Sequence, residues 1–243
     1  MDPFDHYFKS IKDYTAGLRK KDRAVRVWFA DKPAPAVKSP AESRWSRVLK
    51  EDTAVELGGP LSAGTIFFLC TSDVSLICDG RITLVGPDIS ETADRILPLG
   101  QAVLIAGATL TKGINPELEN ELYTAGKIPG YMLRSTGGHI WSRVSHQAMR
   151  DGFSLKLLGQ AILEHIHSNL AAVSAAEVLF VTSNVGDVRE LDKIGGLARD
   201  LAHGLRRERI KQATDGAFQC ESDGDCDICP NSANDHYYHV ERH

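Results

Sequence analysis

The chain has 243 residues, of which 42% are hydrophobic and 25% charged, and its formal net charge is −4. This composition is typical of a globular protein with one large domain, or with one domain and an appendage. The small negative charge and the lack of a long basic run argue against a nucleic-acid partner, and no apolar stretch approaches the roughly 20 residues that cross a bilayer, so we expect no membrane span.

The N-terminus and the cysteine count indicate the cellular compartment. The first six residues, Met1–His6, lack the basic and then apolar arrangement of a secretory signal. The five cysteines are an odd number, which argues against a secreted disulfide framework. We therefore expect a cytoplasmic protein.

The first 40 residues are expected to form an N-terminal arm and a linker. Apolar residues at helical spacing predict a helix from Phe4 to Leu18. Alternation predicts a strand from Ala24 to Ala30. Three prolines between Lys32 and Pro40 indicate a linker that separates this arm from the main domain.

Strand patterns recur through residues 41–214, which we expect to form the main domain. The near-continuous apolar run Thr65–Cys70 predicts a strand buried on both faces. Gln101–Ala108 predicts another buried strand, and Val178–Val181 a further strand. Asp79-Gly80 lies between two further apolar runs and predicts the two-residue turn of a hairpin. Cys70 and Cys78 fall within these strand patterns, and we interpret both as core cysteines without a ligand role.

Helical patterns alternate with these strands. They cover Asn115–Gly126, Leu155–Leu170, and a last segment that starts at Asn184 or Asp187 and runs through Leu205. His165 and His167 would point to different faces of the second helix, which predicts solvated or hydrogen-bonded histidines and not a shared metal. The alternation predicts an α/β fold, with a mixed sheet flanked by helices, an N-terminal helical arm and a C-terminal cysteine-rich tail.

A candidate ligand-binding edge follows the glycine pair Gly137-Gly138. Trp141 and Arg143 come shortly after this pair. An exposed loop ahead of an aromatic residue and an arginine suits a ligand edge. A surface loop whose tryptophan packs against the core explains the same pattern equally well.

The densest chemical signal lies in residues 215–243. Three thiols, Cys220, Cys226 and Cys229, fall within ten residues, and acidic residues separate the first two. Thiolates this close repel one another, and acidic neighbours raise their pKa values, so a bound cation would stabilise them. We therefore predict a metal-binding tail, with a redox dithiol or a tail with incidental cysteines as the alternatives.

Two kinds of metal centre fit this tail. Three thiolates can hold three irons of a 4Fe-4S cluster, with the fourth iron bound by a histidine, a water or a substrate atom. Zinc would instead use Cys226 and Cys229 with Cys220 or with a histidine, His236 or His239.

Short motifs follow one another in a definite order between about residues 50 and 210. They are Val55-Glu-Leu-Gly-Gly-Pro60, Asp79-Gly-Arg-Ile-Thr-Leu-Val-Gly-Pro-Asp-Ile89, Leu97-Pro-Leu-Gly100, Ile105-Ala-Gly107, Trp141-Ser-Arg-Val-Ser-His-Gln-Ala148, Gly152-Phe-Ser-Leu155, Leu158-Gly159 and Val178-Leu-Phe-Val-Thr182. This order resembles the beta subunit family of the carbon monoxide dehydrogenase/acetyl-CoA synthase complex.

The resemblance implies that residues 41–214 correspond to the family's middle α/β domain, which precedes a domain with an iron–sulfur cluster bridged to nickel. It implies that Trp141 and Arg143 match the family's Trp-x-Arg position near the coenzyme A binding region, and thus contact an acyl thioester or a nucleotide. The family's nickel site uses a Cys-Gly-Cys that this sequence does not contain. We therefore favour an iron–sulfur centre smaller than the family's nickel centre, with nickel or zinc as alternatives.

Two functional hypotheses follow. The first is an acetyl-CoA-synthase-like metalloprotein that handles a one- or two-carbon unit (acyl, CO or methyl) at the iron–sulfur centre of the tail. The second is a non-catalytic subunit derived from the same family, which is either a metal-binding accessory or a subunit that docks on a partner protein or carrier.

Overall fold

A computed structural model describes residues 3–30, 48–59, 61–107, 128–136 and 139–214. The chain divides into two compact units, Met1–Ala202 and His203–His243. The last helix, α5 (Val185–Thr214), begins in the first unit and ends in the second. All strands and the other helices belong to the first unit.

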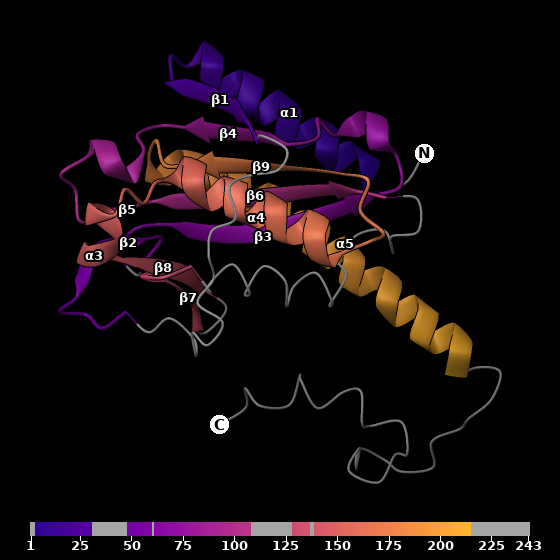
Figure 1. Cartoon of the computed structure of the whole chain (residues 1–243). Coiled ribbons are helices and arrows are strands. Elements are labelled where there is room, and N and C mark those ends of the chain that lie inside the picture. The colour runs from indigo at the N-terminus through magenta and orange to yellow at the C-terminus, as the bar shows by residue number, and fades with distance from the viewer. Residues whose placement is uncertain (1–2, 31–47, 60, 108–127, 137–138, 215–243) are drawn as a thin grey trace, which may run out of the picture. The chain divides into compact units, whose positions relative to one another are not determined.

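A five-stranded mixed sheet forms the centre of this unit (Figure 1). Its strands, in spatial order, are β1 (Val25–Phe29), β4 (Arg81–Val85), β9 (Ala175–Val181), β6 (Leu99–Ala106) and β3 (Gly64–Thr71). The β1–β4 and β6–β9 pairs are antiparallel, whereas the β4–β9 and β3–β6 pairs are parallel. The sheet is therefore mixed, as the sequence predicts.

A four-stranded sheet carries the Trp-x-Arg motif. Its order is β5 (Ile96–Leu97), β2 (Thr53–Leu57), β8 (His139–Ser145) and β7 (Tyr131–Thr136). β8 pairs antiparallel with both β2 and β7. β7 is a strand that none of the sequence patterns described above predicts.

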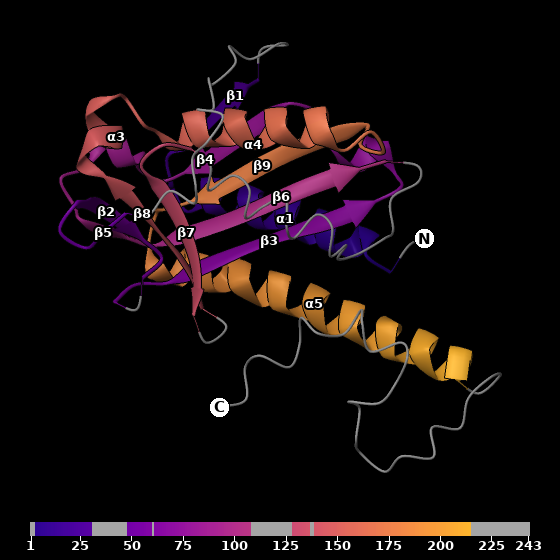
Figure 2. The same ribbon diagram turned by 60° about the horizontal axis from the view of Figure 1, so that its bottom comes forward.

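Helices cover both faces of the five-stranded sheet, with α4 (Leu155–Asn169) on one face and residues 185–202 of α5 on the other (Figure 2). The N-terminal helix α1 (Asp5–Lys20) lies on the α5 side, where the Tyr14 hydroxyl donates a 2.7 Å hydrogen bond to the Asp187 carbonyl. The short helix α3 (His146–Arg150) and the 3-10 turns η1 (Val74–Leu76) and η2 (Ile89–Glu91) complete the fold. Mixed sheets flanked by helices, with an N-terminal helix, confirm the predicted α/β class.

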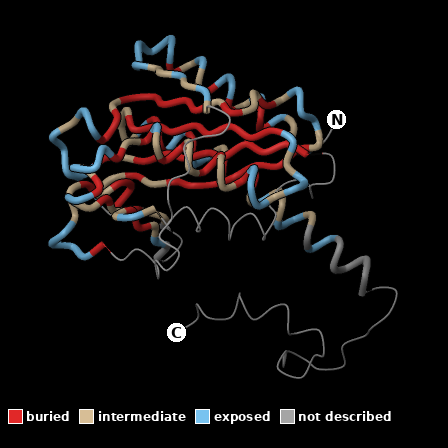
Figure 3. The backbone as a smooth tube through the Cα atoms, in the orientation of Figure 1, coloured by how far each residue is buried: buried red, intermediate tan, exposed pale blue. Residues whose placement is uncertain are grey.

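The central strands are buried because helices cover both faces of the five-stranded sheet. β6 and β9 are buried at every residue, and β3 at all but its first (Figure 3). Phe68 packs in the cluster that includes Leu158 of α4, while Phe67 points the other way, against Gly195 of α5. Because successive strand residues face opposite sides, a strand with two covered faces needs a continuous apolar run.

The predicted hairpin at Asp79-Gly80 is wrong, although the turn itself exists. Gly80 has φ +77° and ends the turn, but the preceding apolar run forms η1 and not a strand. Asp73 explains this, because its side chain accepts a hydrogen bond from the Ser75 amide and caps the 3-10 turn. β4 pairs with β1 and β9 instead.

Several predicted features lie outside the described residues: the linker at Lys32–Pro40, the helix at Asn115–Gly126, the Gly137-Gly138 pair and the tail at 215–243. The division of the chain at residues 40 and 214 stays a prediction. In the structure, β1 pairs with β4, so the strand that follows α1 is an edge of the five-stranded sheet. None of the helices in the described ranges is long and apolar enough to cross a membrane.

Two neighbouring glycines of α5 give a test of this packing. A methyl group on Gly195 would lie 2.5 and 2.7 Å from ring carbons of buried Phe67, whereas one on Gly196 meets nothing within 4 Å. Overpacking should make Gly195→Ala destabilising by about 1–2 kcal/mol. Gly196→Ala should stabilise by up to about 1 kcal/mol through helix propensity. Urea unfolding of both variants measures the difference, and equal effects would contradict the close contact of α5 with β3.

Candidate functional site

The candidate site is built on one side of β8. Arg143 of β8 pairs with Glu56 of β2 across the sheet, and the Arg143 Nε–H donates to Glu56 Oε2 at 3.2 Å. Both side chains are about one-fifth exposed. Trp141, two residues before Arg143, shares its side of the strand, and the Arg143 guanidinium carbon lies 4.7 Å from the Trp141 ring centroid. The two residues that the sequence singles out thus touch each other.

Glycines of the Val55–Pro60 motif allow β2 to reach this position. Gly58 has φ +68°, and a side chain on it would lie 2.8 Å from the Gly64 Cα. A side chain on Gly64 would collide with the Ile140 carbonyl of β8, and one on Gly59 would collide with the Glu56 carboxylate. The glycines therefore permit close backbone approach and leave space for the carboxylate that holds Arg143.

Arg134 of β7 belongs to the same surface and was not identified from the sequence. The β7–β8 register places it directly opposite Trp141, so both side chains project to the same side of the sheet. Arg134 is exposed and makes no ion pair with any residue that the structure describes. Only the pairing register, which the sequence does not display, reveals this second guanidinium beside the indole.

The arrangement suits a planar ligand that carries negative charge. An indole face stacks on aromatic bases, and guanidinium groups bind phosphate or carboxylate oxygens in a forked geometry. Arg143 is already held by Glu56, so its charge is partly balanced and its position fixed. Among the described residues Arg134 has no ion-pair partner, so its charge is the one on this surface that a ligand can pair with.

A second motif from the sequence, Gly86-Pro87-Asp88, has a structural role. The Asp88 side chain accepts a 3.0 Å hydrogen bond from the Leu155 amide at the start of α4. The Thr182 hydroxyl donates a 2.6 Å bond to the Pro87 carbonyl. Gly86 has φ +108°, and any side chain there would collide with the backbone at Ser183. This motif joins the ends of β4 and β9 to the first turn of α4.

The predicted metal ligands Cys220, Cys226, Cys229, His236 and His239 all lie outside the described residues. Across the described ranges there is no group of three or more histidine, cysteine or acidic residues that could hold a metal ion.

The cysteines and histidines within the fold take other roles. Cys70 is buried in β3, and burial raises its pKa to about 12, as suits an unreactive core thiol. Cys78 is partly exposed, because the residues before it form η1 and not a strand. His167 Nε2 lies 3.0 Å from Asp79 Oδ1, and the ring of His165 lies 3.0 Å from the Asn169 amide nitrogen. The two histidines thus have separate partners, as the helical spacing predicts.

The family model of the CO dehydrogenase/acetyl-CoA synthase complex beta subunit matches residues 37–186, more than half of the chain. The acetyl-CoA decarbonylase/synthase complex subunit beta of Methanopyrus kandleri is 30% identical over 193 residues, and that of Methanothermobacter thermautotrophicus is 25% identical over 188. Subunit beta 1 of the same complex from Methanosarcina thermophila is 26% identical over 192 residues. Each match covers 75% of this chain, and the chain spans about 40% of the length of these curated relatives.

A double-mutant cycle tests the geometry of the site. Glu56→Gln, Arg143→Gln and the double variant should give a coupling energy of about 1 kcal/mol in urea unfolding, since the pair is largely shielded from water. The matched control is the Lys21–Glu190 pair, at 3.3 Å, whose side chains are 54% and 53% exposed. Its coupling should be about 0.3 kcal/mol or less. Equal coupling in the two cycles would show that Glu56 does not hold Arg143 in place.

Proposed function

Because this chain belongs to the CO dehydrogenase/acetyl-CoA synthase complex beta subunit family, we propose that it is an acetyl-CoA-synthase-like protein that handles a one- or two-carbon unit. The observation that carries this proposal is the match over residues 37–186, which includes the whole Trp141–Arg143 surface. The named relatives are subunits of an acetyl-CoA decarbonylase/synthase complex. We propose that this chain contacts coenzyme A or an acyl thioester.

The site geometry supports a coenzyme A contact. Coenzyme A has an adenine ring and phosphate groups, which require a stacking face and cationic donors. Trp141 supplies the face, and Arg134 and Arg143 supply guanidinium groups beside it. In this proposal Glu56 is a positioning residue, because it fixes Arg143 and does not itself contact the ligand.

The tail is proposed to hold the metal centre. Cys220, Cys226 and Cys229 would supply three thiolates, and His236 or His239 a further ligand. A 4Fe-4S cluster is the preferred occupant because the family resemblance implies an iron–sulfur centre after the middle domain; zinc and nickel are the alternatives. When bound, such a cluster could supply Lewis-acid or electron-transfer chemistry.

A partner protein is also proposed, because the printed names of the relatives describe subunits of a complex. A subunit can act in a complex as an enzyme or as an accessory that docks on a catalytic partner. The accessory role is therefore the second candidate function for this chain.

Coenzyme A binding tests the first part of the proposal. Titration of the full chain with coenzyme A should give saturable binding, and Trp141→Leu should weaken it about tenfold, the effect expected for losing one stacked base. Trp28→Leu is the matched control, since Arg26 lies 5.7 Å over the Trp28 ring in a similar stack on β1. Trp28→Leu should leave binding unchanged. Loss of binding in both variants, or in neither, would contradict a coenzyme A contact at Trp141.

Metal analysis tests the second part. Protein purified without oxygen should contain iron and acid-labile sulfide and should be brown, and Cys226→Ser should lose most of both. Cys78→Ser is the control, because Cys78 lies in the first compact unit, outside the proposed metal-binding tail, and its substitution should leave the metal content unchanged. If the protein contains zinc and no sulfide, the tail holds a structural zinc site and not an iron–sulfur cluster. Colourless protein without iron, nickel or zinc would contradict any metal centre and leave a non-catalytic subunit that docks on a partner.

A further inference from the structure

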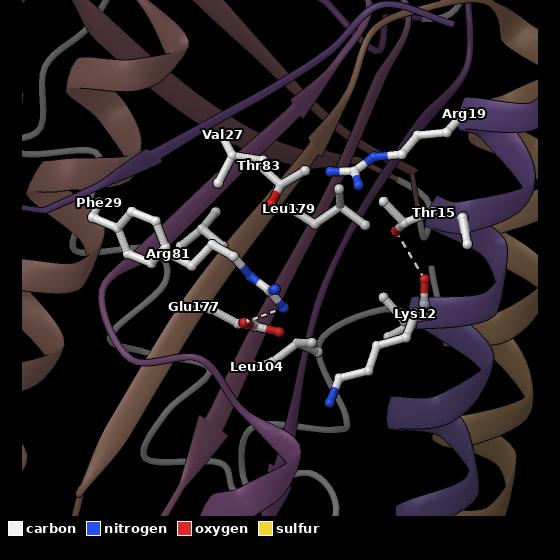
Figure 4. A pocket seen from close by; sticks show the side chains of 13 residues that line it. Lys12, Thr15, Arg19, Val27, Phe29, Arg81, Thr83, Leu104, Glu177 and Leu179 are labelled. Carbon is white, nitrogen blue, oxygen red and sulfur yellow. Dashed lines mark hydrogen bonds and ion pairs between the residues drawn. The ribbon is translucent and has the colours of Figure 1, made fainter. Parts of the chain in front are cut away.

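A groove lies between α1 and the five-stranded sheet, on the α5 side, with a volume of about 470 Å³ (Figure 4). This volume is within the range of small-molecule sites. One wall is α1, and the floor is formed by β1, β4, β9 and β6. Both α1 and β1 precede residue 37, where the family match begins, so much of the groove is built from a part of the chain outside that match.

Strand register explains what forms the floor. Phe29 is paired with Arg81, and Leu104 with Glu177, so these four side chains form one row across the sheet. A second row contains Val27, paired with Thr83, and Thr83, paired with Leu179. The first row places a charged pair between two apolar residues, and the second places one hydroxyl between two apolar residues.

The buried carboxylate of the first row is already satisfied. The Arg81 guanidinium lies 2.7 Å from Glu177 Oε2, which also accepts a 3.0 Å hydrogen bond from the Cys78 amide. Burial raises the pKa of Glu177, and the positive charges of Arg81 and Lys12 oppose that shift. Glu177 and Arg81 therefore balance each other, which leaves the groove with the positive charges of α1.

Arg19 is the cation best placed for a ligand. Its side chain extends from α1 into the groove toward Thr83 (Figure 4). Neither Arg19 nor the Thr83 hydroxyl has an ion-pair or hydrogen-bond partner among the residues that the structure describes. By contrast, the hydroxyl of Thr15 is used by its own helix, because it donates to the Ile11 carbonyl at 2.8 Å. A guanidinium and a hydroxyl that line the same groove without such partners can both bind an anionic group.

The apolar part of the groove lies next to this cation. Phe29 and Val27 of β1 are 58% and 39% exposed, which is high for large apolar residues at the edge of a core. Leu179 continues this surface inward and is almost fully buried. A ligand with an apolar or aromatic body would cover the exposed faces of the two β1 residues.

We propose that this groove binds a small organic anion, with its carboxylate, phosphate or sulfonate head on Arg19 and Thr83 and its apolar body against Val27 and Phe29. This site is separate in sequence from the Trp141 surface and does not depend on the proposed coenzyme A contact. The ligand class follows from the Arg19 guanidinium, the Thr83 hydroxyl and an adjacent apolar wall, and Lys12, which also lines the groove, adds a second positive charge. A neutral apolar molecule would leave Arg19 without a partner, and a purely inorganic anion would leave Phe29 exposed.

The probe for this site is 1-anilinonaphthalene-8-sulfonate, which joins an anionic head to an aromatic body and fluoresces when shielded from water. The full chain should bind it with one-to-one stoichiometry by calorimetry. Arg19→Gln should weaken binding about tenfold, the effect of losing one charge-assisted hydrogen bond. Lys20→Gln is the matched control, because it removes the same charge from the same turn of α1 but does not line the groove, and it should bind as the unchanged chain does.

Two further measurements complete the test. Thr83→Val should also weaken binding, and circular dichroism should show that the fold of each variant is retained. Phenyl phosphate and benzoate should displace the probe, whichever head group the physiological ligand carries, whereas benzyl alcohol should not. Equal affinity of the Arg19→Gln and Lys20→Gln variants, or equal displacement by the neutral alcohol, would overturn the proposal.

Discussion

The five-stranded sheet has to be covered on both faces, and the rest of the structure depends on this constraint. β9, at its centre, is buried at every residue. α4 covers one face, while α1 and the first part of α5 cover the other. Asp187, at the start of α5, connects α5 to the N-terminal segment, since its carbonyl accepts a hydrogen bond from Tyr14 of α1 and its carboxylate binds Arg23 at 2.9 Å. The N-terminal helix is thereby tied to the sheet it covers.

The motifs that resemble the family divide into two physical kinds. Gly58, Gly86 and Asp88 are explained by close backbone approach and helix capping, which are requirements of the fold. Trp141 and Arg143 are different, because their partly exposed side chains stack on one another at the surface of the smaller sheet. The glycines and Asp88 therefore account for the similarity of the fold to that of the family. A ligand contact shared with the family would have to involve Trp141 and Arg143.

The two candidate ligand surfaces use related chemistry in different settings. At β8 the arginine is held in place by Glu56, and an aromatic ring lies over it. In the groove under α1 the carboxylate of Glu177 is held by Arg81, which leaves the positive charges of Arg19 and Lys12 on the α1 wall. In both places a glutamate forms an ion pair with one arginine. A ligand anion then binds more readily to the neighbouring cations that have no such partner, because the charge of the paired arginine is already balanced.

Sequence alone determined the elements whose signal is local. The apolar runs of β3, β6 and β9, the helical spacing of α1 and α4, and the Trp-x-Arg motif could all be recognised because periodicity and short motifs are properties of neighbouring residues. Tertiary structure decided which strands pair: it replaced the expected hairpin before Arg81 with pairing to β1 and β9, and it placed Arg134 opposite Trp141. It also placed Arg19 and Thr83 in the lining of one groove. These outcomes depend on contacts between residues far apart in the chain, which are fixed by the packing of whole elements and leave no local pattern.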